Sequence, residues 1–102
     1  MRNILLALLF CGSVYAQDKV IVHINAEFNG SNDWYGIESL AGVKLYSGII
    51  EKNPAIKEKY NITKVPTLLL FVDGKEVSRW EAGLDMKLSA TVREVQQTID
   101  SK

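Results

Sequence analysis

The feature that most constrains this chain is an unbroken apolar run from Thr67 to Val72, which reads Thr-Leu-Leu-Leu-Phe-Val. Its length is that of a strand, and its continuous apolar character is typical of a strand covered on both faces of a sheet. Asp73 and Gly74 follow it and predict a tight hairpin turn, because glycine adopts positive φ angles without steric cost. The more polar stretch 75–81 then predicts an antiparallel partner at the edge of the sheet.

Two further strands and one helix are indicated upstream of this hairpin. Residues 19–25 are nearly continuous in apolar character and predict a central strand, and residues 43–50 predict another. Between them, residues 29–33 are rich in helix-capping side chains. They predict the start of a helix that passes through Trp34 and Leu40 and ends at the glycine signal Ala41-Gly42.

Two more helices complete the pattern. Pro54 predicts the first turn of a short helix whose inward face carries Ile56 and Tyr60. Asp85 is expected to cap a final helix that runs to about Asp100, with an apolar stripe formed by Met86, Leu88, Val92, Val95 and Ile99. The order of elements predicts an α/β fold: a four-stranded mixed sheet with helices on both faces.

The first 16 residues predict a signal peptide rather than part of the fold. A positive residue, Arg2, precedes an apolar run from Ile4 to Phe10, and a small-residue cleavage site follows at Val14-Tyr15-Ala16. We therefore expect a signal peptide over residues 1–16, one domain over residues 17–102, and an exported, periplasmic or secreted product. Cleavage would remove Cys11, the single cysteine of the chain, so neither a disulfide nor thiol chemistry is expected afterwards.

Two segments of the chain resemble thioredoxin. One has the pattern Tyr60-x-Ile62-x-x-Val65-Pro66-Thr67-Leu68-x-x-Phe71-x-x-Gly74, and Gly83 matches a further glycine after the last strand. The other, residues 22–32, is similar to the strand that leads into the thioredoxin sequence Ala-Glu-Trp-Cys-Gly-Pro-Cys. Here that motif reads Asn29-Gly30-Ser31-Asn32, so asparagines stand where both redox cysteines would be. The resemblance implies a thioredoxin-like fold that lacks the N-terminal strand and helix.

The resemblance also implies where a binding surface would lie. In the family, a loop with a cis proline pairs with an extended segment of the substrate protein. The matching residues here are Lys64, Val65 and Pro66, which we call the Pro66 loop. Beside them we expect the Asn29–Asn32 turn and the aromatic side chain of Trp34. The alternative, which the residues themselves favour, is that the turn is a plain helix cap.

His23 and Ser47 occupy the places of the buried acid and the lysine that assist thioredoxin chemistry, so by resemblance both members of that proton relay are replaced. The residues themselves favour a neutral core histidine with a hydrogen-bond partner. A lone histidine without a cluster of cysteines or carboxylates predicts no metal site. We expect no cofactor.

Three functions are compatible with the sequence. The first is a redox-inactive module that binds an extended segment of another protein through the Pro66 loop and the Asn29–Asn32 turn. The second is an assembly component that oligomerises through its sheet edge. The third is an enzyme that uses Ser31 with His23.

The balance of positive and negative charge limits the classes of partner that we expect. The chain has twelve basic and twelve acidic residues, which gives no electrostatic case for nucleic acid. We expect no membrane association after cleavage of the signal peptide, and a monomer or weak homo-oligomer.

Overall fold

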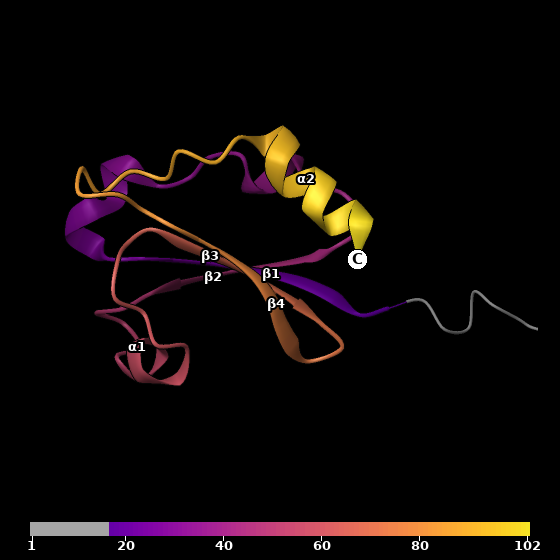
Figure 1. The fold of residues 1–102 in the computed structure, drawn as a ribbon. Helices are drawn as coiled ribbons and strands as arrows, with labels where there is room; N and C mark the ends of the chain where they lie inside the picture. Colours follow the sequence, from indigo (N-terminus) through magenta and orange to yellow (C-terminus); the bar gives the residue numbers. More distant parts are fainter. Residues whose placement is uncertain (1–16) are drawn as a thin grey trace, which may run out of the picture.

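The computed structural model describes residues 17–102, and the predicted signal peptide and Cys11 lie outside the described residues. Figure 1 shows a twisted sheet between two layers of helical segments. In chain order the elements are β1 (Lys19–Asn25), the 3₁₀ helices η2 (Glu27–Asn32) and η3 (Ile37–Ser39), β2 (Lys44–Ile49), α1 (Ala55–Lys59), β3 (Thr67–Val72), β4 (Lys75–Glu81) and α2 (Val92–Ser101).

The described residues form one four-stranded sheet with the strand order β2-β1-β3-β4. Strands β1 and β2 are parallel, whereas β3 is antiparallel to both β1 and β4. The hairpin that joins β3 to β4 turns at Asp73 and Gly74, which both have positive φ angles (53° and 84°). The predicted α/β architecture, the mixed sheet and the hairpin are confirmed.

Each face of the sheet has its own hydrophobic core. On the face covered by α2, η2 and η3, the core contains Ile21, Leu68, Leu70, Val95 and Ile99. On the face covered by α1, it contains Ile24, Ile62, Val65 and Leu69, with the half-buried Ile56 and Tyr60 packed against it as predicted. Successive residues of β1 and β3 alternate between the two cores, because the side chains of a strand point to opposite faces.

The helix predicted over residues 34–41 is wrong. The structure has two short 3₁₀ segments here, separated at Asp33, whose φ and ψ angles of −53° and 143° end the first one. The capping side chains that suggested a helix start form no cap, and Asp33 instead accepts a hydrogen bond from Asn25. The segment left to form a helix is only about two turns long and contains Gly36, too little for a stable helix.

The predicted start of the last helix is also wrong. The helix begins at Val92, and Thr91 and Glu94 form a capping box at its N-terminus. Asp85 instead accepts a hydrogen bond from the N–H of Lys87, and Met86 has a positive φ angle of 60°, so this part of the chain is a turn. The Thr-x-x-Glu pattern was present in the sequence and is a known start signal.

Replacing Gly36 by alanine is expected to destabilise the fold. A β-carbon at this position would overlap a methyl carbon of Val92 and lie 3.0 Å from the Trp34 ring, so at least one of these side chains must shift. We expect a loss of roughly 1–3 kcal/mol in the free energy of unfolding, measured by urea denaturation. Gly30→Ala is the matched control, because no atom lies within 4 Å of its new β-carbon. Equal effects of the two substitutions would contradict this account of the packing.

Candidate functional site

Three chain segments meet at one end of the sheet. Helix η2 follows β1, the Pro66 loop precedes β3, and residues 82–90 follow β4. Because β3 is antiparallel to both neighbours, the C-terminal ends of β1 and β4 and the N-terminal end of β3 lie at the same end of the sheet. The peptide bond between Val65 and Pro66 in this loop is cis. The topology thus brings the Asn29–Asn32 turn and the Pro66 loop together.

Asn29, the first residue of the Asn29–Asn32 turn, is a buried structural residue. It is only 4 % exposed, and its φ and ψ angles (−106° and 20°) are not helical although it lies within η2. Its amide nitrogen lies 3.1 Å from Asn25 Oδ1, 3.3 Å from the carbonyl oxygen of Val65 and 3.1 Å from that of Met86. Its amide oxygen accepts a hydrogen bond from Asn32 Nδ2 at 2.8 Å. One side chain therefore ties all three segments together.

Asn25 is the partner that sequence reasoning missed. It is fully buried at the end of β1, and its Oδ1 accepts hydrogen bonds from the N–H of Ala26 (2.8 Å) and from Asn29 Nδ2. Its Nδ2 donates to the carbonyl oxygen of Asn29 (3.0 Å) and to Asp33. The available signal was a polar amide that ends an otherwise apolar strand, since a buried amide needs such partners.

Several of the predicted site residues are not on the surface. Trp34 is 9 % exposed, belongs to the core under α2, and donates its indole N–H to the carbonyl oxygen of Ala90 at 2.9 Å. Val65 and Pro66 are buried as well. Only Ser31 and Lys64 of the predicted set are exposed, while Gly30 and Asn32 are half-buried. The predicted surface is therefore mostly a buried scaffold.

The carbonyl groups of the Pro66 loop already accept hydrogen bonds. The carbonyl oxygen of Lys64 accepts one from the Thr67 hydroxyl at 2.6 Å. That of Val65 accepts one from Asn29, and that of Pro66 accepts one from the N–H of Ala82 at 3.1 Å. These three intramolecular hydrogen bonds hold the loop in place, and each uses a main-chain carbonyl oxygen of the loop.

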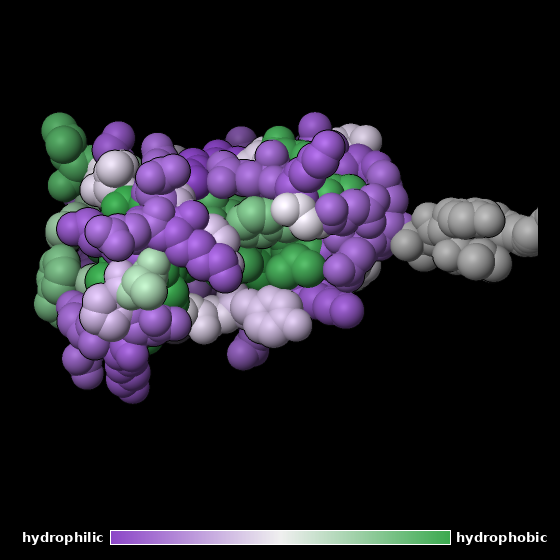
Figure 2. Space-filling view, turned by 90° about the horizontal axis from the view of Figure 1, so that it is seen from below, coloured by the Kyte–Doolittle hydropathy of each residue, from purple (hydrophilic) through white to green (hydrophobic). Residues whose placement is uncertain are grey.

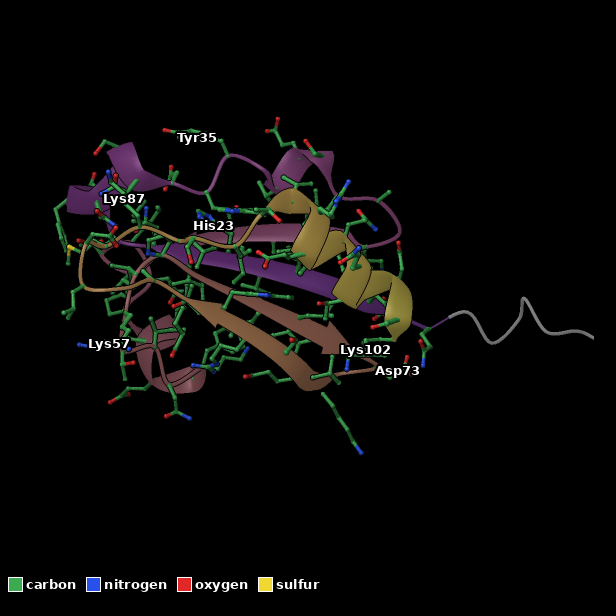
Figure 3. The ribbon with its side chains drawn as sticks, turned by 45° about the horizontal axis from the view of Figure 1, so that its top comes forward. His23, Tyr35, Lys57, Asp73, Lys87 and Lys102 are labelled. Carbon is green, nitrogen blue, oxygen red and sulfur yellow. The ribbon has the colours of Figure 1, made fainter. Side chains whose placement is uncertain are left out.

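His23 is buried (5 % exposed) between the sheet and the segment that carries Tyr35 (Figure 3). Its Nε2 accepts a hydrogen bond from the N–H of Trp34 at 3.3 Å. Burial lowers the pKa of His23, and the carboxylate of Asp33 opposes this shift. Ser47 lies opposite His23 in the register of β1 and β2 but is exposed.

An enzyme that uses Ser31 with His23 finds no support in this geometry. Ser31 is exposed, whereas His23 is buried with Nε2 engaged by Trp34. Within residues 17–102, no hydrogen bond joins His23 to Ser31 or to Ser47. A nucleophile needs its base within hydrogen-bond reach.

A groove of about 440 Å³ lies between the Pro66 loop, η2 and the loop after β4. Three large apolar side chains with high exposure line it: Phe28 (71 %), Leu84 (103 %) and Met86 (40 %). Viewed from the α1 side, Figure 2 shows hydrophobic side chains gathered at this end of the molecule. Sequence reasoning missed these residues. Their only signal was that apolar side chains interrupt turn-forming stretches, as in Gly83-Leu84-Asp85.

Comparison with solved structures identifies the fold. A mutant thioredoxin from Halobacterium salinarum superposes with a TM-score of 0.66 and 22 % identity, over 86 % of this chain and 77 % of the other. Thioredoxin-2, a component of malaria parasite protein secretion machinery, gives 0.64 and 11 % identity, over 84 % of both chains. The chain has a thioredoxin-like fold. Both identities are low, so these likenesses establish the architecture and leave the activity to the site.

Sequence comparison adds a partial match. A thioredoxin from Chlamydia caviae is 53 % identical over 30 residues, which is 29 % of this chain and 29 % of that protein. No family model matches the chain.

Residues 17–102 contain no group of three or more His, Cys, Asp or Glu side chains placed to hold a metal ion. In the same residues, no helix combines the length and the apolar character needed to cross a membrane.

The lowered pKa of His23 predicts a pH-dependent stability. Above about pH 6.5 the residue is neutral in both states, and below it the unfolded chain takes up a proton more readily than the folded one. The free energy of unfolding should therefore fall as the pH drops from about 6.5 towards the lowered pKa of the folded state. Urea denaturation at several pH values measures this slope. In His23→Gln, which does not titrate, the slope should be shallower, and identical slopes would contradict the assignment.

Asn29→Ala is expected to loosen the whole site. The substitution leaves Asn25 Oδ1 and the Val65 and Met86 carbonyl groups without a shared buried donor, which should cost roughly 1–3 kcal/mol in the free energy of unfolding. Amide hydrogen exchange should also quicken in residues 82–90. Asn32→Ala removes one hydrogen bond to Asn29 and is the matched control with a smaller expected effect. If both variants had the same stability, the central role of Asn29 would be refuted.

Proposed function

We propose that this chain is an exported, redox-inactive module that binds an extended segment of another protein. The observation that carries the proposal is the groove beside the Pro66 loop, where Phe28, Leu84 and Met86 expose apolar surface around a concave site. Exposed apolar side chains are ordinary when they are scattered, but their gathering around one groove is typical of a binding site.

The absence of thiols supports redox inactivity. Disulfide exchange requires a thiolate that attacks and a second thiol that resolves the mixed disulfide. The residues in those places are Asn29 and Asn32, and residues 17–102 contain no cysteine. The Asn29 amide is moreover buried and fully engaged, so this position serves the architecture of the site.

The groove implies a particular mode of binding. Because the carbonyl groups of the Pro66 loop already accept internal hydrogen bonds, we infer that main-chain pairing at the loop is not the main source of affinity. Burial of a partner's apolar side chains against Leu84, Met86 and Phe28 would supply it instead. A groove of this size favours weak binding, with dissociation constants of roughly micromolar to millimolar.

A specific observation also favours the assembly function. Strand β2 lies at one edge of the described sheet, and it exposes Leu45 (38 %) and Tyr46 (57 %). An edge strand with exposed apolar side chains can pair with another chain. The edge is only six residues long and includes Lys44, a residue type that discourages such pairing, so we rank assembly second.

Selection from a library of random peptides of about eight residues tests the binding function. Enriched peptides should be rich in apolar residues and should bind the purified chain in fluorescence anisotropy. Leu84→Ser should weaken this binding roughly five- to twentyfold without unfolding the chain, because Leu84 is fully exposed. Val77→Ser on β4, also exposed and outside the groove, is the matched control.

Two results would overturn the proposal. One is equal binding by Leu84→Ser and the unmodified chain, and the other is reduction of insulin disulfides above background. Sedimentation of the purified chain distinguishes the second candidate, since stable oligomers would favour assembly through β2.

A further inference from the structure

The charges that line the groove beside the Pro66 loop are unbalanced. Lys57 at α1 and Lys64 in the loop both line it, and both are exposed. Neither forms a salt bridge within the part of the chain that the structure describes. The one acidic lining residue, Glu51, uses Oε1 to accept a hydrogen bond from the N–H of Glu27 at 2.8 Å. The lining thus carries two ammonium groups against one carboxylate, and neither ammonium group is held in a salt bridge.

The hydrogen-bonding groups of the groove also favour a ligand with negatively charged acceptors. The carbonyl oxygens of Lys64, Val65 and Pro66 each accept an internal hydrogen bond, which uses one of the two lone pairs of each oxygen. The lysine side chains are donors without acceptor capacity. A ligand that supplies negatively charged acceptors matches this site better than one that supplies donors.

The apolar part of the groove lies next to these charges. Leu84, Met86 and Phe28 line the same concavity as Lys57 and Lys64. Figure 3 shows Lys57 at this end of the molecule, with Asp73 of the hairpin at the opposite end. A ligand that fills the groove would therefore bury apolar side chains and bring its acidic groups within reach of the lysines.

We infer that the groove selects extended protein segments in which acidic side chains flank apolar ones. The inference rests on the proposed function and names the partner class of that same site. Apolar burial provides the affinity, and the two lysines provide the selectivity. Charges at an interface rim steer association and discriminate between partners more than they raise affinity. The preference for acidic segments should therefore be moderate and sensitive to salt.

A matched pair of peptides tests the inference. Both carry an N-terminal fluorescein and a C-terminal amide, and their sequences are Ser-Glu-Leu-Phe-Glu-Ser and Ser-Lys-Leu-Phe-Lys-Ser. At about 0.02 M salt the acidic peptide should bind the purified chain roughly three- to tenfold more tightly in fluorescence anisotropy. At about 0.5 M salt this difference should largely vanish, because the ions screen exposed charges.

Charge-reversal variants assign the effect to the groove. In Lys57→Glu/Lys64→Glu the preference should invert in favour of the basic peptide. Lys75→Glu carries a reversed charge in the β3–β4 hairpin, outside the groove, and should keep the preference of the unmodified chain. Circular dichroism verifies that each variant is folded.

The possible failures are distinguishable. Equal binding of both peptides, unchanged by salt and by the double variant but weakened by Leu84→Ser, would refute the acidic preference and leave the proposed function standing. Binding of neither peptide at millimolar concentration would refute both. A preference that disappears in Lys75→Glu as well would show a general charge effect and would overturn the assignment to Lys57 and Lys64.

Discussion

The structure depends on the burial of β3 on both of its faces. Leu68, Leu69 and Leu70 have no exposed surface, and they alternate between the core under α2 and the core over α1. Each such side chain contributes roughly 1.5–3 kcal/mol when it is fully buried. This one strand therefore stabilises both cores. Because β3 lies between β1 and β4, the segments that follow these two strands meet the Pro66 loop at one end of the sheet.

The parts of the fold that the sequence predicted are those governed by local periodicity. The apolar run of β3 and the Asp73-Gly74 turn have strong local signals, and both are found as predicted. The prediction for the segment after η2 is wrong because Asn29 and Asp33 resemble caps, while their side chains in fact form hydrogen bonds with Asn25. That competition depends on tertiary contacts, which no local pattern reveals. The predicted start of α2 is wrong for a different reason. The sequence contains two candidate caps, Asp85 and the Thr91–Glu94 capping box, and the helix starts at the second.

For the candidate site too, one feature could be predicted from the sequence and another could not. The meeting of the Asn29–Asn32 turn with the Pro66 loop followed from the resemblance to thioredoxin, and the hydrogen bond from Asn29 to the Val65 carbonyl group shows the two in contact. Which side chains would be exposed could not be predicted. Trp34 turns into the core because its indole N–H finds the carbonyl group of Ala90, whereas Leu84 is left outside by the turn around Met86. Exposure is a property of the assembled fold.

The buried amide of Asn29 explains where the apolar groove lies. An amide has two donor hydrogens and an acceptor oxygen, and once buried it must satisfy them, whereas a thiol makes only weak hydrogen bonds. The two hydrogens of Asn29 are shared among three acceptors, on Asn25, the Pro66 loop and the loop after β4, and its oxygen accepts from Asn32. The same bonds consume polar groups that a partner could otherwise reach. They also hold the loop after β4 against η2, which leaves Leu84 and Met86 beside Phe28 at the groove. The Asn29 side chain therefore helps to position the groove, because it holds together the segments that line it.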